Sequence, residues 1–225
     1  MSKVPMGFLA AALVALAAPA ARADDYEIGA TSGARWMRSD SVDTLSAQDA
    51  HPVVGLEASR RVPGVELLGF ELRAGLEYQL GGLTGTTFRR IDSSLLSHTV
   101  HAVGRLERRL SPRLSVYGRA ALGYTTASLS VVDRMSAATR PTRDRARAAS
   151  GVLGVGLYMP LRDVPILGRF GLRVELDYAR VGGLAFRAEP DSGGDGALTI
   201  PVLAASLGEL DISGLDFRVG LVGRF

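Results

Sequence analysis

Apolar and polar residues alternate along several stretches of the chain. In residues 68–80 one face carries Leu68, Phe70, Leu72, Ala74, Leu76, Tyr78 and Leu80, and the other carries Gly69, Glu71, Arg73, Gly75, Glu77 and Gln79. Because successive side chains of a β-strand point to opposite faces, this pattern predicts a strand with one apolar and one polar face. The alternation recurs at 114–124 and 170–178, more weakly at 26–36, 51–62, 96–110 and 149–161, and in a last segment that begins before Phe217 and ends at Phe225. We therefore expect about eight strands.

The segments between these strands alternate in length. Residues 62–64, 111–113 and 162–168 make short connections, whereas 39–50, 81–93, 133–147 and 182–212 make long, mostly polar ones. Short turns at one rim and long loops at the other are typical of single-chain membrane barrels. The prediction is an all-β fold, an antiparallel up-and-down transmembrane β-barrel of about eight strands.

Aromatic residues at the strand ends indicate which face meets lipid. Trp36, Tyr78, Tyr124 and Tyr178 lie next to long connections, while Tyr26, Phe70 and Phe170 lie near the opposite rim, where we also expect Phe217 and Phe225. Two such belts are expected at the two membrane–water interfaces. The alternation of apolar and polar residues with a period of two is also compatible with a soluble β-sandwich or barrel. The membrane interpretation therefore depends on the aromatic belts and on the amino-terminal segment.

The polar face is expected to fill the barrel, because eight strands leave an interior just wide enough for side chains. We expect a lumen network of both charge signs that includes Glu71, Arg73, Glu77, Arg105, Glu107, Arg119, Arg173, Glu175, Asp177 and Arg218. The alternation, or parity, of positions along each strand also places Glu27, Arg35, Glu57 and Arg224 on this inward face. Arginine–carboxylate pairs can satisfy one another where single buried charges would be prohibitive. This interior excludes a wide aqueous pore, with room for water only near glycines such as Gly154, Gly156 and Gly220.

Residues 1–23 have the layout of a cleavable secretory signal: a basic start, an apolar stretch and Ala-Arg-Ala before two aspartates. Residues 24–225 then form one domain. The chain has no cysteine, so an exported protein of this sequence would be stable without disulfides. The formal charge of +3 is too small for a nucleic-acid partner, which we do not expect.

The sequence LDFRVGLVGRF at residues 215–225 resembles the carboxy-terminal assembly signal of bacterial outer-membrane barrels. The residues that carry the resemblance are Phe217, Val219, Gly220, Leu221 and Phe225, and Gly223 departs from it by standing where a larger apolar residue is usual. With the signal sequence, the alternation and the loop asymmetry, residues 24–225 resemble the eight-stranded outer-membrane barrels of the OmpA-domain and OmpX type. The resemblance implies a Gram-negative outer membrane, both termini in the periplasm, surrounding lipopolysaccharide and the barrel-assembly machinery as a partner. We expect a monomer without cofactor or metal.

No sequence motif assigns a reaction. Some small barrels that resemble this one are lipid A deacylases with a histidine and a serine two residues apart, but the neighbours of His98 at that spacing are Leu96 and Val100. We therefore expect no enzyme but an envelope-structural or surface-interaction protein. The alternatives are a narrow OmpW-like channel for small or apolar solutes and, less favoured, a lipid-A-modifying enzyme.

Two of the long connections leave their own alternatives open. Arg134, Arg140, Arg143, Arg145 and Arg147 within 133–147 either pair with lipopolysaccharide phosphates or form a solvated loop. The segment EPDSGGDG is interpreted as a flexible loop tip rather than a calcium loop. The apolar segment 197–210 either extends the last hairpin or folds over the mouth of the barrel.

Overall fold

The computed structural model describes residues 25–37, 39, 42, 45, 46, 48–87, 91–133, 142–161, 170–188 and 205–225. The proposed signal sequence, Arg134, Arg140 and the segment EPDSGGDG lie outside the described residues. Within the described residues no helix is long and apolar enough to cross a membrane.

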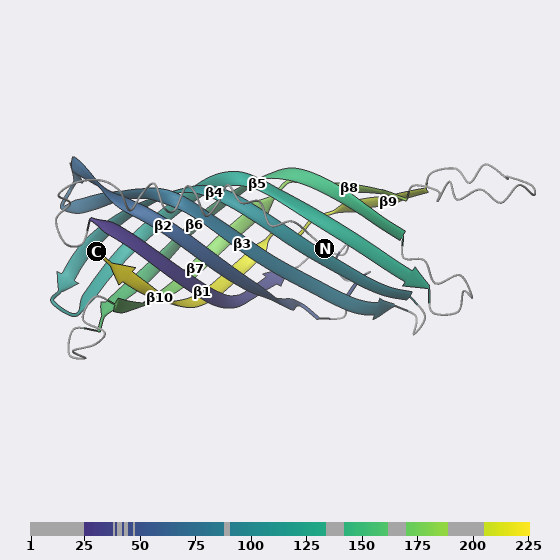
Figure 1. Ribbon diagram of the computed structural model, residues 1–225, viewed down its shortest axis with the longest axis horizontal. Helices are drawn as coiled ribbons and strands as arrows, with labels where there is room; N and C mark the ends of the chain where they lie inside the picture. Colours follow the sequence, from purple (N-terminus) through teal and green to yellow (C-terminus); the bar gives the residue numbers. More distant parts are fainter. Residues whose placement is uncertain are drawn as a thin grey trace, which may run out of the picture.

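Eight strands form a closed antiparallel barrel (Figure 1). They are β1 (Tyr26–Met37), β2 (Ala50–Leu67), β3 (Phe70–Thr87), β4 (Ile91–Ser111), β5 (Leu114–Asp133), β6 (Thr142–Pro160), β7 (Phe170–Val181) and β10 (Gly214–Arg224). From β1 to β7 each strand pairs with the next along the chain, and β7 pairs with β10, past the intervening β8 and β9. The strand β10 closes the ring on β1 in a register that places Glu27 opposite Arg224. The predicted up-and-down barrel of about eight strands is confirmed.

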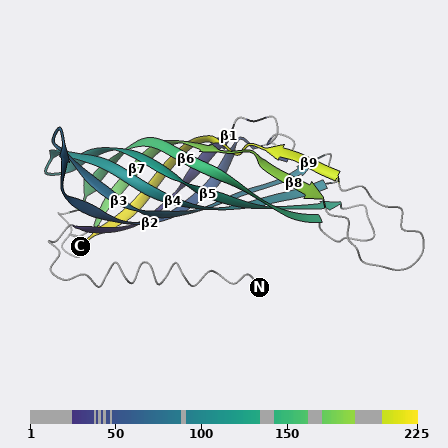
Figure 2. The same ribbon diagram turned by 90° about the horizontal axis from the view of Figure 1, so that it is seen from above.

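Two further strands, β8 (Leu184–Ala188) and β9 (Ala205–Leu210), pair with each other in a separate two-stranded sheet. Both views place this hairpin at the end of the barrel opposite the start of β1 and the end of β10 (Figures 1 and 2). Residues 205–210 of the apolar segment 197–210 form β9 of this hairpin, and Leu210 at its end is buried, so this part of the segment has features of both alternatives that the sequence leaves open. Residues 197–204 lie outside the described residues.

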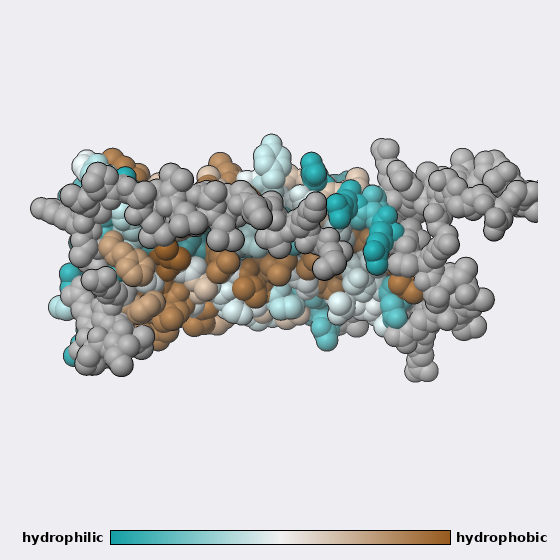
Figure 3. All heavy atoms as spheres, viewed as in Figure 1, coloured by the Kyte–Doolittle hydropathy of each residue, from teal (hydrophilic) through white to brown (hydrophobic). Residues whose placement is uncertain are grey.

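The two faces of the wall differ as the alternation predicts. Residues that point outward from β1, β7 and β10 are exposed, and those between them are buried. Hydrophobic side chains gather on the outer surface over the half of the barrel nearer the carboxy terminus, and hydrophilic ones toward the other end (Figure 3). Backbone pairing runs around the whole ring, so every barrel strand has a partner on both sides.

Several strands continue beyond their predicted ends. Residues 81–87 and 91–93 extend β3 and β4, and 142–147 extend β6, although the sequence interpretation assigned these residues to long loops. The strands β2 to β6 have 18 to 21 residues, about twice the 9–11 that a membrane crossing needs. The prediction failed because the apolar residues change faces: Leu80 points outward, whereas Leu83 and Leu95 are buried inside.

One of the short turns also lies elsewhere than predicted. The connection expected at residues 62–64 is part of β2, where the pairing with β3 is irregular between Arg61 and Glu66. The chain reverses instead at Leu68 and Gly69, which both have positive φ, 53° and 79°. Two successive residues with positive φ are what a tight hairpin turn that follows the twist of the strands requires, and glycine supplies one of them without strain.

Candidate functional site: a charged interior beneath an apolar cap

The barrel interior holds charges in equal numbers. Among the described residues, seven inward-facing carboxylates face seven inward-facing arginines: Glu27, Glu57, Glu77, Glu107, Glu175, Asp177 and Asp216 with Arg35, Arg73, Arg105, Arg119, Arg173, Arg218 and Arg224. All are buried except Arg224, whose side chain is 13% exposed. Removing a charge from water is expensive unless a partner and further hydrogen bonds compensate it, so the pairing pattern decides whether this interior is stable.

Glu77 is the centre of one cluster. Its two carboxylate oxygens accept hydrogen bonds from Arg119 (2.7 Å) and Arg218 (2.6 Å). Asp177 and Glu175 lie on the other side of the same two guanidinium groups, with Arg218 2.5 Å from Asp177 and 2.8 Å from Glu175. These groups come from β3, β5, β7 and β10, so the cluster ties together walls on different sides of the barrel.

Glu27 is the centre of a second cluster nearer the termini. It forms ion pairs with Arg105 and Arg173, and its other oxygen accepts a hydrogen bond from Arg224 Nε at 2.9 Å. Glu57 adds contacts of 2.7 Å to Arg105 and 2.8 Å to Arg173. Residues 146 positions apart in the chain, Glu27 and Arg173, thus meet at one carboxylate.

Arg224 continues this cluster toward the end that carries the termini. Its two terminal nitrogens bind both oxygens of Glu107, at 3.0 and 2.7 Å. Its guanidinium carbon lies 3.7 Å from the centre of the Tyr158 ring. The forked pair and the aromatic contact together hold this arginine across the mouth of the barrel.

A third pair lies toward the opposite end. Arg35 binds both oxygens of Asp216, at 2.6 and 2.8 Å. Gln79 accepts a hydrogen bond from Arg35 at 3.4 Å and donates one to Glu77 at 3.0 Å, which joins this pair to the central cluster. The sequence interpretation did not include Asp216 in the lumen network. Asp216 lies two residues before Arg218 and therefore on the same inward face, so the alternation could have identified it.

Glu71 does not belong to this interior. Its side chain is 42% exposed and lies 2.7 Å from Arg61, which is also partly exposed. Glu71 has the inward parity, but it is the second residue of β3 and therefore lies at the rim. Parity specifies a face of the strand and not a depth within the barrel, which is why the sequence pattern included it.

The glycines expected to leave room for water face side chains instead. A Cβ atom at Gly154 would meet Asp177, one at Gly156 would meet the Tyr117 ring, and one at Gly220 would meet Thr31. The absence of a side chain at Gly156 lets the tyrosine ring lie across the neighbouring strand, where its hydroxyl donates to Glu175 at 2.9 Å. These positions contribute packing space for the network rather than water pockets.

Above the charges lies an apolar cluster that we call the cap. It comprises Met37, Val42, Leu83, Leu95, Ala127, Leu129, Ala146, Val181, Leu184, Phe186, Leu210 and Ile212, with Leu45, Val131 and Ala148 against it. The hairpin β8–β9 and the β1–β2 connection supply its centre, and the inner faces of the extended strands supply its wall. Ser93 donates to the backbone oxygen of Leu45 at 2.8 Å, which fastens that connection to β4.

Most of the outer aromatic residues lie near one end of the wall or the other, and their place at the two membrane–water interfaces stays a prediction. Trp36, Tyr124 and Tyr178 are exposed on the outer surface near the cap end, and the first residue of β1, Tyr26, pairs with Phe225 at the other end through two backbone hydrogen bonds of 2.9 Å. Tyr78 is partly exposed toward the cap end, and Phe70 and Phe170 begin their strands near the termini. Phe217 was expected near the termini but pairs with Ala34, two residues from Trp36, and so lies toward the cap end.

The pattern of the outer membrane protein β-barrel domain matches residues 7–225. The chain belongs to this family of outer-membrane β-barrels. No curated protein sequence matches it significantly. Among solved structures, a major outer membrane protein from Thermus thermophilus is 13% identical, with a TM-score of 0.51, over 89% of this chain and 98% of its own.

Two other solved structures are similar to this outer-membrane barrel. Neisserial surface protein A is 12% identical with a TM-score of 0.49, covering 89% of this chain and 96% of its own. Ail, the attachment invasion locus protein of Yersinia pestis, is 12% identical with a TM-score of 0.47, covering 91% and 100%. At such identities the likeness concerns the fold alone.

The last strand of this outer-membrane barrel presents the residues of the expected assembly signal. Phe217, Val219, Leu221 and Phe225 are exposed on the outer surface, whereas Gly220 faces inward. Gly223, where a larger residue is usual, is covered: a Cβ there would lie 3.0 Å from the Phe225 ring and 3.4 Å from the Phe170 ring. Two neighbouring aromatic rings thus occupy the space, and recognition by the assembly machinery stays a prediction.

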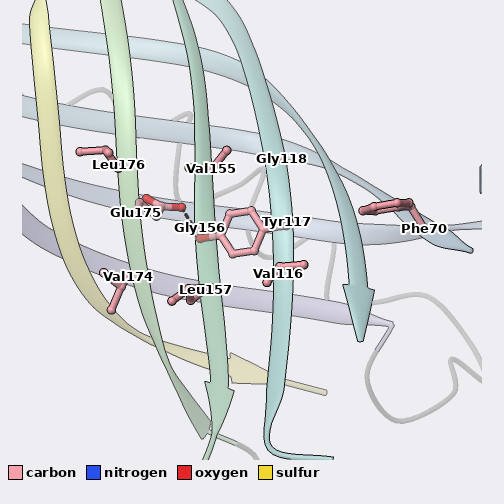
Figure 4. A pocket seen from close by; sticks show the side chains of 10 residues that line it. All are labelled: Phe70, Val116, Tyr117, Gly118, Val155, Gly156, Leu157, Val174, Glu175 and Leu176. Atoms are coloured by element: carbon pink, nitrogen blue, oxygen red, sulfur yellow. Dashed lines mark hydrogen bonds between the residues drawn. The ribbon is translucent and has the colours of Figure 1, made fainter. Parts of the chain in front are cut away.

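A shallow recess of about 450 Å³ lies in the wall formed by β5, β6 and β7. Figure 4 shows Val116, Leu157, Val174 and Leu176 around it, with Tyr117 and Glu175 joined by their hydrogen bond. Gly118, which faces outward and where a Cβ would meet nothing within 4 Å, leaves the depression between the larger side chains. Its outward-facing aliphatic lining suits contact with lipid.

The histidines take structural positions. His98 faces outward, with its Nδ1 2.5 Å from the Tyr78 hydroxyl. His101 faces inward and contacts Ser150 at 3.0 Å, and His51 is buried. Within the described residues no group of three or more histidine, aspartate or glutamate side chains is arranged to hold a metal ion.

Proposed function

We propose that this outer-membrane barrel is a closed envelope protein that carries a surface platform and conducts no bulk solute. The observation that supports it best is the neutral ion-pair network of seven arginines and seven carboxylates through the described interior. A solute that crossed this interior would have to separate pairs such as Glu77 with Arg119 and Arg218. Leaving either partner buried and unpaired costs several kcal/mol, so the resting barrel stays filled.

The cap supports the same conclusion from the other end. Its apolar side chains close the mouth above the charges, and water gains nothing by entering a space without polar partners. A path through the barrel therefore meets two barriers of different chemistry, one apolar and one ionic.

The strands that extend beyond the membrane support the surface role. At the cap end the strands β3 to β6 continue as paired β-structure, and the separate two-stranded sheet β8–β9 lies beside them, so this end carries ordered strands where loops were expected. We propose that this end is extracellular and that the turns at Leu68–Gly69 and Pro112–Arg113, together with the termini, are periplasmic. Long loops outside and short turns inside are the usual arrangement for such barrels.

Conductance tests the closed interior. Protein purified and refolded in detergent is inserted into planar bilayers, beside a general porin as a positive control for insertion and detection. We expect at most small, infrequent steps, because eight strands enclose only a side-chain-filled lumen, whereas water-filled porins have about 16–18. Stable openings of porin size would refute the closed barrel and favour the channel alternative.

A further inference from the structure

A cavity lies at the mouth of the barrel that is nearer the termini. Its volume is about 430 Å³, and the ends of β3, β4, β5 and β6 line it together with single residues of β2 and β10. On its inner side lie the forked pair of Arg224 with Glu107 and the Tyr158 ring, which belong to the filled interior. The cavity is therefore a dead end, in which a solute can bind without passing through the barrel.

Positive charge predominates in this mouth cavity. Five arginines and two glutamates line it. Three of these seven residues belong to the neutral interior network, and Arg61 and Glu71 form a pair of their own at 2.7 Å. The remaining two are Arg108 and Arg109, so the mouth carries two positive charges more than its carboxylates balance.

Arg109 faces into the mouth. It lies two residues after the inward-facing Glu107 and opposite the buried Ser115 of β5, which also lines the cavity. Its guanidinium group donates hydrogen bonds to the backbone oxygens of Ser111 at 3.3 Å and Pro112 at 3.5 Å. These bonds use two of its five N–H groups. Among the described residues no carboxylate lies within 4.0 Å of this guanidinium group, so a charged group and free donors remain for a ligand.

Arg108 contributes from the rim. It has the opposite parity, and its guanidinium carbon lies 5.7 Å from the centre of the Phe70 ring. It too forms no ion pair with a described carboxylate. Arg108 therefore adds positive potential to the mouth from the outer side, whereas Arg109 adds it from within.

We propose that the mouth cavity binds a small organic dianion, a phosphate monoester or a dicarboxylate. The two excess charges match two negative charges, and the guanidinium group of Arg109 and the hydroxyl of Ser115 are suitable donors to carboxylate or phosphate oxygens. Leu114 and Pro160 offer apolar contact to the organic part of the ligand. The volume lies within the range of roughly 300–1,000 Å³ that is usual for small-molecule sites.

A soluble ligand is favoured over a lipid headgroup because Arg109 and Ser115 point to the inside of the wall, away from the acyl chains. This inference goes beyond the proposed closed barrel and does not depend on its direction in the membrane. Only the source of the ligand rests on the proposed orientation, in which this end faces the periplasm.

Equilibrium dialysis of the folded protein in a non-ionic detergent tests the site. The probes are radiolabelled glycerol 3-phosphate and succinate, with glycerol and acetate as neutral and monoanionic comparisons. We expect both dianions to bind the wild type at least about ten-fold more tightly than acetate, and glycerol not to bind. Arg109→Gln should weaken the binding of both dianions about ten-fold, and Ser115→Ala about three-fold without a change of charge.

Arg113→Gln is the matched control, since Arg113 is exposed on the same turn and is not among the residues that line the cavity. It should keep the wild-type affinity, and heat-modifiable migration in gels verifies that each variant is folded. Equal affinities of the wild type and Arg109→Gln, or equal weakening by Arg113→Gln, would overturn the proposal. A loss caused by Arg108→Gln but not by Arg109→Gln would place the anion on the lipid-facing side and overturn it too. A failure of the closed barrel is recognised separately, by its conductance.

Discussion

Glu77 shows what a single residue contributes in a filled barrel. It is buried, it faces Arg119 and Arg218, and it also accepts a hydrogen bond from Gln79. Glu71 lies six residues earlier on the same strand, with the same parity, and forms a partly exposed pair with Arg61. Glu77 pairs with two buried arginines and Glu71 with one partly exposed arginine, so the same substitution should have different consequences in the two dielectric surroundings.

Replacing each glutamate by glutamine compares these environments directly. In urea unfolding from lipid vesicles, Glu77→Gln should lower the free energy of unfolding by about 3 kcal/mol, since it leaves two buried guanidinium groups short of a charge. Glu71→Gln should change it by less than about 1 kcal/mol, because water compensates exposed pairs. A loss as small for Glu77→Gln as for Glu71→Gln would show that water already reaches the interior.

The extended strands show how one element can serve two environments. Up to about Leu80, β3 points its aliphatic residues outward and its charges inward; beyond Gly81 and Gly82 the apolar Leu83 is inside and Thr84 is outside. The strand does not change its twofold periodicity. The surroundings change from lipid outside and ions inside to water outside and an apolar cap inside.

We expect the cap to unfold locally while the barrel stays folded. Phe186 is 2% exposed within it, whereas its neighbour Ala185 points to solvent. Phe186→Ser removes a buried ring, a change that typically costs about 3–5 kcal/mol, and should raise amide hydrogen exchange of β8 and β9 by about ten-fold or more. Ala185→Ser is the control. Exchange in β1, β7 and β10 should stay at the wild-type rate in both variants, and a general acceleration would show that the cap and barrel unfold as one unit.

The whole molecule has two different ends, and the proposed topology assigns one to each side of the membrane. The chain has no cysteine, so single cysteines report position without background. Val65 is exposed at the end with the termini, and Thr84 is exposed on the outer face of β3 at the cap end.

A membrane-impermeant maleimide applied to intact cells should label Thr84→Cys and spare Val65→Cys, since only the cap end faces the medium in the proposed orientation. Cells opened by osmotic shock should label both, which controls for reactivity and expression. Labelling of Val65→Cys alone in intact cells would reverse the topology.

The sequence by itself determined the barrel, the approximate strands and the side of the wall on which each residue lies. Period two is a local property, because each residue of a strand points opposite to its neighbours wherever the strand is placed. That suffices to put Glu77, Arg119 and Arg218 inside and Leu76, Leu122 and Phe217 outside. It also explains the failures, since Glu71 and Phe217 were assigned correctly to a face and wrongly to a height.

Only the tertiary structure decided depth, pairing and closure. Glu27 and Arg173 meet because the register around the closed ring brings β1 and β7 to the same level, and no local pattern encodes that register. The cap forms because β8–β9 and the β1–β2 connection fold onto apolar residues that their own strands cannot cover. Burial across the barrel depends on which elements meet, a property of the assembled ring that the alternation along any single strand does not contain.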